Sequence, residues 1–260
     1  WYFAYLIFAI FVVHKIKRSQ ALTFPEFVSQ HISPRAGKIT AFLVFIKMLP
    51  IVYSVAIGIF ISTIFGLELI SAIILGVVLV TIYCSLGGFR AVVITDMMQF
   101  LVMFAGVLSV VFASYFKFGG IEYLLDNLPP SHFIPTSSEG VLHSFIWLFI
   151  AISSTMVSPV FYQRCFAVKN VTVARRGIMI AIMFWFVFDI CTTLGGLYAC
   201  AHMPEADSLN AYLHYALEIL PTGIRGMFVA AILSTILSTL DSYLFISSSV
   251  LSYDLAPKQL

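Results

Sequence analysis

The chain has 260 residues, of which 61% are hydrophobic and 10% are charged, and its formal net charge at pH 7 is +2. A soluble domain is about half apolar and about 25% charged, so this composition excludes an ordinary soluble globule and predicts an all-α polytopic membrane protein. The small net charge gives no basis for a nucleic-acid-binding surface.

Long hydrophobic blocks separated by short polar loops fill one transmembrane domain, 1–260. Because a helix needs about 20 residues to cross the hydrocarbon core, we predict six transmembrane helices after a shorter helical remnant. The remnant is 1–13, and the helices are 39–65, 68–86, 91–116, 141–163, 177–201 and 223–252. The chain opens inside a hydrophobic run and stops just past another, so we expect further helices on both sides.

Lysine and arginine are distributed unequally between alternate loops. Loops rich in these residues resist translocation and stay cytoplasmic. The predicted cytoplasmic set is Lys15, Lys17, Arg18, Arg35, Lys38, Arg90, Arg164, Lys169, Arg175, Arg176 and Lys258. The predicted outer set is Lys117, Arg225, Glu122, Asp126, Glu139, Glu205, Asp207 and Glu218. We therefore expect a multi-pass protein of the cell (inner or plasma) membrane.

Four ionisable residues lie inside the predicted helices: Lys47, Asp96, Asp189 and Asp241. A charge in hydrocarbon is costly unless it is paired, hydrated or bound to an ion, so each residue is a candidate for function. The alternative for an aspartate is a structural hydrogen bond to a neighbouring helix. Lys47 can instead extend its ammonium to the interface, or pair with Asp189.

The last predicted helix carries a row of hydroxyl groups. Thr235, Ser238, Thr239 and Ser242 are spaced i, i+3, i+4 and i+7, so a helix places them on one face, near Asp241. Hard cations prefer several oxygen ligands, which favours a sodium site. The alternative is that the hydroxyls bond back to carbonyls of their own helix or allow close helix packing.

The block 141–163 contains a helix breaker in Ser153-Ser154-Thr155-Met156-Val157-Ser158-Pro159. Interrupted helices in transporters expose backbone groups to substrate near the midplane. A proline kink without a function is the alternative, because neighbouring helices can satisfy the freed carbonyl.

Three stretches, in order along the chain, carry a family resemblance. They are ALTFPEF at 21–27, GGFRAVVITDMMQ at 87–99, and LSTLDS at 237–242 with SSS and YDL behind it. Together they resemble the sodium/solute symporter family, which includes the sodium/proline, pantothenate, glucose and choline transporters. The resemblance implies a leucine-transporter-like fold with two inverted repeats of five helices, of which this chain would hold core helices 2 to 8.

The resemblance also implies roles for residues of the last helix. It implies a sodium site between core helices 1 and 8 that uses the hydroxyls of Ser238 and Thr239 and the carbonyl of Thr235. Asp96 matches an aspartate of core helix 5 near a second sodium position or the inner exit path, with Ser242 facing it. Asp241 either binds the ion or organises core helix 8.

The same resemblance places Ser158, Phe161, Tyr162 and Gln163 where core helix 6 meets the substrate. The predicted function is sodium-coupled symport of a small organic solute by alternating access. Na⁺ is the predicted coupling ion, and the predicted partners are the solute and the lipid bilayer. An amino acid such as proline, or a carboxylate, is favoured ahead of sugars.

Enzyme chemistry is not expected, because the sequence shows no nucleophile with a paired base and no phosphate-binding glycine loop. Two alternatives to sodium symport stay open. One is a transporter-like sensory module of a signalling protein. The other is a proton-coupled carrier that uses Asp96 or Asp241.

Overall fold

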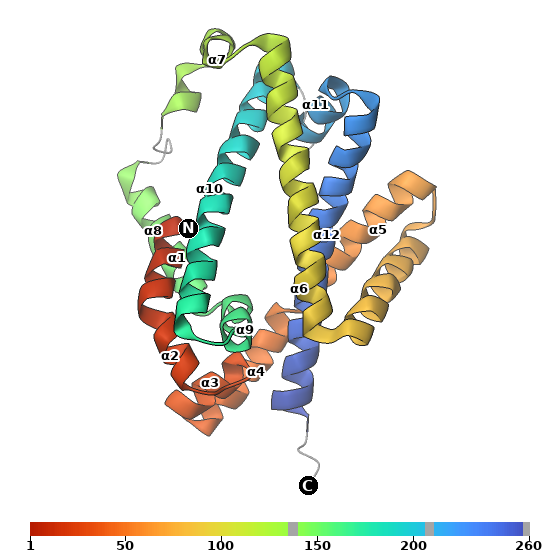
Figure 1. Cartoon of the computed structure of the whole chain (residues 1–260). Coiled ribbons are helices and arrows are strands. Elements are labelled where there is room, and N and C mark those ends of the chain that lie inside the picture. Colours follow the sequence, from red (N-terminus) through yellow and green to blue (C-terminus); the bar gives the residue numbers. More distant parts are fainter. Residues whose placement is uncertain (135–139, 206–210, 257–260) are drawn as a thin grey trace. The chain divides into compact units, whose positions relative to one another are not determined.

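A computed structural model describes residues 1–134, 140–205 and 211–256, and every regular element in these ranges is helical (Figure 1). The helices form two compact units. The first unit comprises Trp1–Val93, Phe145–Met183 and Leu237–Leu260, and the second comprises Ile94–Ser144 and Phe184–Ile236. Glu139, Asp207 and Lys258 lie outside the described residues.

Four helical segments are long and apolar enough to cross a membrane: Pro34–Phe65, Leu69–Phe118, Val171–His202 and Thr222–Leu255. A fifth candidate is the pair Val141–Met156 and Pro159–Ala167, which is bent by 43°. These segments agree with an all-helical chain that is apolar over most of its length. The six spans drawn from the sequence stay predictions.

The first unit contains these complete elements: α1 Tyr2–Ile7, η1 Phe8–Val12, α2 Val13–Arg18, α3 Phe24–His31, α4 Pro34–Lys47, α5 Ile51–Phe65, α9 Pro159–Ala167 and η3 Leu251–Leu255. Four helices run through both units: α6 Leu69–Phe118, α8 Val141–Met156, α10 Val171–His202 and α12 Thr222–Val250. The second unit adds α7 Ile121–Asn127, η2 Pro130–Phe133 and α11 Ala211–Ile219.

Polar residues and prolines set the start of the short helices of the first unit. The Thr23 hydroxyl accepts a hydrogen bond from the Glu26 amide at 3.2 Å, and the Ser33 hydroxyl accepts one from the Ala36 amide at 3.1 Å. Each helix also has a proline in its first turn, where the missing N–H costs nothing. Both caps therefore follow from local sequence.

Two cations join the N-terminal helix to later segments of the first unit. The π-helical turn η1 departs from the α-helical hydrogen-bond pattern, and Arg175 donates to the Ala9 and Ile10 carbonyls in it at 3.0 and 2.8 Å. Lys17 donates to the carbonyls of Phe166 and Val168 at 3.1 and 2.7 Å, which satisfies the end of α9. The helix α1–α2 is thereby fixed beside α9 and the start of α10 (Figure 1).

The structure has two helix interruptions, one at the predicted breaker and one at Gly88, which lies between the predicted helices 68–86 and 91–116. Gly88 has φ 56° and ψ −153°, a conformation that glycine adopts readily, and it breaks α6 into two helical parts. The second interruption falls between Met156 and Pro159, where α8 ends and α9 begins. Proline at the first position of α9 explains why α8 does not continue.

The core of the second unit is rich in tyrosine. Tyr215 is fully buried and donates to the Ser114 hydroxyl at 2.6 Å, and Ser114 donates to the Val110 carbonyl at 2.7 Å. Tyr198 donates to the Gly119 carbonyl at 2.6 Å. Burial raises the pKa of Tyr215 to about 12, so its phenol stays a neutral donor.

Candidate functional site

The predicted hydroxyl row lies on one face of α12. An α-helix turns by about 100° per residue, so Thr235, Ser238, Thr239 and Ser242 share a face, and Asp241 lies beside Ser238, about 110° from the centre of that face. Thr235 is exposed, Ser238 and Thr239 are half-buried, and Ser242 is buried. The exposure of the row decreases towards Ser242.

Some hydroxyls of α12 bond back to their own helix, as the alternative to an ion site predicted. Thr235 donates to the Ala231 carbonyl at 3.0 Å, and Ser249 donates to the Phe245 carbonyl at 2.7 Å. Such a bond uses the hydroxyl hydrogen and leaves the oxygen lone pairs available. Back-bonding of this kind is therefore compatible with coordination of a cation.

Asp241 and Ser242 contact neighbouring helices of the first unit. Asp241 is fully buried, and its Oδ2 accepts a hydrogen bond from the Tyr83 hydroxyl at 2.9 Å. Arg164 Nη2 donates to Ser242 Oγ at 3.3 Å. Sequence reasoning missed Tyr83 and did not connect Arg164 with this face. The available signal for Tyr83 was its phenolic hydroxyl between Thr81 and Ser85, near the end of the predicted helix 68–86.

The other ionisable residues predicted inside the membrane lie in different places. Asp96 is half-buried on α6 in the second unit, and Asp189 is exposed on α10 in the same unit. Lys47 is exposed at the end of α4 in the first unit. The pairing of Lys47 with Asp189 and the approach of Ser242 to Asp96 stay predictions.

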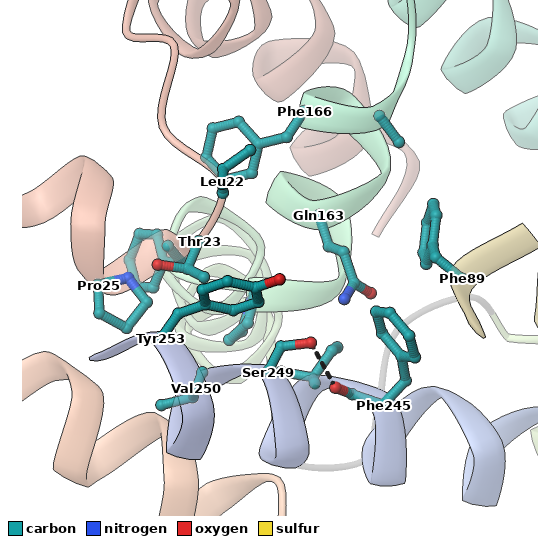
Figure 2. Close-up of a pocket in the computed structure, with 14 residues that line it drawn as sticks. Leu22, Thr23, Pro25, Phe89, Gln163, Phe166, Phe245, Ser249, Val250 and Tyr253 are labelled. Carbon is teal, nitrogen blue, oxygen red and sulfur yellow. Dashed lines mark hydrogen bonds between the residues drawn. The ribbon is translucent and has the colours of Figure 1, made fainter. Parts of the chain in front are cut away.

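A pocket of about 240 Å³ lies in the first unit beside α9 and the end of α12 (Figure 2). Its lining residues include aromatic rings and neutral polar groups, and none of them is charged. The lining is Leu22, Thr23, Phe24, Pro25, Phe89, Pro159, Gln163, Phe166, Ala167, Phe245, Ile246, Ser249, Val250 and Tyr253. Figure 2 shows the Gln163 amide pointing into this space, toward Phe245 and Ser249.

Of the four predicted substrate residues, Gln163 is the one that lines the pocket. Ser158 precedes α9 as its N-cap. The rings of Phe161 and Tyr162 pack on Phe8 with centroid distances of 5.3 and 5.6 Å. Tyr162 also donates to the Met156 carbonyl at 3.1 Å, so it satisfies backbone at the helix break. Substrate contact by Ser158, Phe161 and Tyr162 stays a prediction.

One side of the pocket is joined to α3 by a side-chain contact. The Thr23 hydroxyl donates to Asp254 Oδ1 at 2.9 Å, and Thr23 is buried. Asp254 Oδ2 is buried and has no hydrogen-bond partner among the described residues. Because Thr23 and Tyr253 line the pocket, opening the Thr23–Asp254 contact would change its wall.

Apolar helices of membrane-spanning length, an interrupted helix and buried polar groups define a multi-pass α-helical membrane protein. The Sodium:solute symporter family matches residues 1–258, and the chain belongs to this family. The resemblance read from the three sequence stretches is thus confirmed.

Several characterised relatives are similar to the chain. It is 29% identical over 202 residues to a sodium/pantothenate symporter of Haemophilus influenzae, covering 75% of this chain and 42% of the relative. It is 24% identical over 272 residues to a sodium/glucose cotransporter of Vibrio parahaemolyticus, covering 90% and 50%. It is 25% identical over 213 residues to the human sodium-coupled monocarboxylate transporter 2, covering 74% and 34%. The chain spans half the length of these relatives or less.

Proposed function

We propose that the full-length protein is a symporter that couples inward movement of Na⁺ to uptake of a small organic solute. Family membership and the hydroxyl face of α12 support this proposal. The single observation that carries it is the set of Thr235, Ser238 and Thr239 on one accessible helix face, because oxygen ligands in hydrocarbon suit a hard cation.

The proposed sodium ligands on α12 are the hydroxyls of Ser238 and Thr239 and the carbonyl of Thr235. On the family resemblance, the partner helix is core helix 1. We assign Asp241 a positioning role, because it accepts a hydrogen bond from Tyr83 and lies at the edge of this face, three residues after Ser238. Asp96 is proposed to serve a second sodium position or the exit path, together with Ser242.

The proposed solute path includes the pocket beside Gln163. The uncharged lining with an amide, hydroxyls and aromatic rings is suited to a small solute that is only partly polar. We favour an amino acid or a carboxylate ahead of sugars. The printed names of the relatives cover pantothenate, glucose and monocarboxylates, so they support a small solute without selecting one.

Alternating access requires that Na⁺ and solute favour a shared conformation, since a ligand with equal affinity for both states shifts nothing. We propose that the Thr23–Asp254 contact belongs to the conformation closed toward the cytoplasm. It joins α3 to η3 at the wall of the pocket. An inverted-repeat fold of the leucine-transporter type is part of this proposal.

The test is radiolabelled solute uptake by the full-length protein in membrane vesicles, with proline, a monocarboxylate, pantothenate and glucose as the panel. Wild type should take up one of these with a sodium gradient. Ser238→Ala with Thr239→Ala should abolish sodium stimulation. Ser247→Ala with Ser248→Ala, which removes two hydroxyls of α12 away from the proposed face, should retain it.

Normal sodium stimulation in the Ser238/Thr239 variant would exclude the proposed site. Uptake that ignores sodium and follows a pH gradient would replace sodium coupling by proton coupling.

A further inference from the structure

Two long stretches of the first unit contain cations and no acidic residue. Between Trp1 and Pro25, and between Phe145 and Met183, the sequence has no aspartate or glutamate. Their lysines and arginines are Lys15, Lys17, Arg18, Arg164, Lys169, Arg175 and Arg176. The stretches are in contact through Lys17 and Arg175, which bond backbone carbonyls across them. A concentrated positive charge therefore lies on one part of this unit.

The structure separates these cations into two groups. Lys17 and Arg175 donate to carbonyls, and Arg164 donates to Ser242. Lys15, Arg18, Lys169 and Arg176 have exposed side chains, and we call these four residues the basic rim. The first group fixes the helices, whereas the basic rim can contact an anion from outside the protein.

The basic rim continues directly into exposed apolar surface. On the N-terminal helix, Lys15 and Arg18 are spaced i and i+3 on α2, so they share a face, and Phe11 precedes them in η1. On α10, Arg176, Ile180 and Met183 are spaced i, i+4 and i+7, so they lie on one face. Phe11, Ile180 and Met183 are 64%, 54% and 70% exposed. Thus α10 places Arg176 at one end of an exposed apolar stripe, and the N-terminal helix places Lys15 and Arg18 after the exposed Phe11.

We propose that the basic rim binds the headgroup of an anionic phospholipid. The phosphate would contact the four cations, and the acyl chains would lie along Phe11, Ile180 and Met183. These apolar residues favour a lipid over a soluble anion, because free phosphate or an acidic protein segment gains nothing from them. The predicted cytoplasmic position of these cations places the lipid in the inner leaflet.

The experiment measures binding of dioleoyl phosphatidylglycerol to the purified, delipidated full-length protein, with phosphatidylcholine as neutral lipid. The test variant is Lys15→Gln with Arg18→Gln and Arg176→Gln. At about 1 kcal/mol per cation near an anionic lipid, the loss corresponds to roughly hundredfold weaker binding. The control, Lys47→Gln with Lys117→Gln and Arg225→Gln, removes the same charge from exposed cations that have no exposed apolar residue at i+4 and i+7 of their own helix, and it should bind as wild type does.

A charge-conserving variant, Lys15→Arg with Arg18→Lys and Arg176→Lys, should bind phosphatidylglycerol like wild type and so separates loss of charge from misfolding. Unchanged binding by the glutamine variant would overturn the proposal, as would an equal loss in the control. Complete displacement of the lipid by excess inorganic phosphate would also overturn it, because the apolar residues would then contribute nothing.

Discussion

The two units differ in the kind of polar contact that holds them together. The first unit carries every lysine and arginine of the chain except Lys117 and Arg225. Its long-range contacts involve ionisable side chains, such as Thr23–Asp254 and Tyr83–Asp241. The second unit buries neutral hydroxyl contacts in its aromatic core, and its ionisable pair, His202 with Glu218 at 3.0 Å, lies at an exposed position.

This difference indicates different roles. A neutral hydroxyl pair in a dry core, such as Tyr215–Ser114, stabilises one arrangement and has no competing ligand. An ionisable contact beside a pocket can exchange its partner for water or an ion. We therefore expect substitutions in the tyrosine core of the second unit to change stability, and substitutions at the ionisable contacts of the first unit to change sodium dependence.

The largest effect on stability is expected at Gly106. A Cβ atom at Gly106 would lie 2.5 Å from the Ala231 Cβ, so Gly106→Ala forces the two helices of the second unit apart. We expect the free energy of unfolding to fall by about 2 kcal/mol, as in overpacked cores. Gly226→Ala is the matched control, because its Cβ meets open space and gains helix propensity.

Gly106→Ala and Gly226→Ala are each compared with wild type by thermal unfolding of the full-length protein in detergent. The sodium concentration that gives half-maximal uptake should be the same for wild type and for the folded fraction of Gly106→Ala. Equal melting temperatures for Gly106→Ala and Gly226→Ala would show that the close contact does not constrain the second unit.

Next in size is an effect on function in the first unit. Thr23→Val removes the hydroxyl that donates to Asp254, while keeping the shape of the side chain. If the contact stabilises the conformation closed toward the cytoplasm, sodium half-saturation of uptake should rise roughly tenfold, since a hydrogen bond to a charged group is worth about 1.5–3 kcal/mol.

Thr23 also caps α3, so the cap needs its own control. Ser33→Ala removes only the cap of α4 and should cost about 1 kcal/mol of stability without changing sodium half-saturation. Thr23→Ser keeps the hydroxyl and should behave like wild type. A sodium shift of equal size in Ser33→Ala would assign the effect to helix capping.

The smallest effect is expected from Tyr215→Phe. This change removes one buried hydrogen bond to Ser114, while Ser114 still donates to the Val110 carbonyl. We expect the free energy of unfolding to fall by about 1 kcal/mol. A double-mutant cycle with Ser114→Ala measures the coupling, and a coupling near zero would contradict the contact.

Features that depend on local chemistry could be predicted from the sequence. Pro159 and the glycine pair before Phe89 mark the two interruptions. Proline cannot continue a helix because it lacks an N–H, and glycine permits backbone angles that other residues avoid. The hydroxyl face of α12 likewise follows from spacing alone. Family membership followed from motifs rather than from physical reasoning.

The sequence could not predict which helices pack against each other. Membrane helices are apolar on all sides, so the spacing of hydrophobic residues does not identify the face that is buried in the protein. The packing of Phe161 and Tyr162 on Phe8 is one example of a contact without a sequence signal. Nothing in the sequence predicts that Lys17 and Arg175 donate to distant carbonyls, because other lysines and arginines in the loops have similar sequence surroundings. The hydrogen bond from Tyr83 to Asp241 could not be predicted either, because it joins residues 158 positions apart, and sodium binding by Asp241 stays a prediction.

The most direct measurement is binding of radioactive sodium to the purified full-length protein without solute. Wild type and Ser247→Ala with Ser248→Ala should bind Na⁺ saturably and alike, while Ser238→Ala with Thr239→Ala should bind roughly hundredfold more weakly, because two ligands of a cation are lost. Sodium binding by the Ser238/Thr239 variant with wild-type affinity would contradict a sodium site on α12.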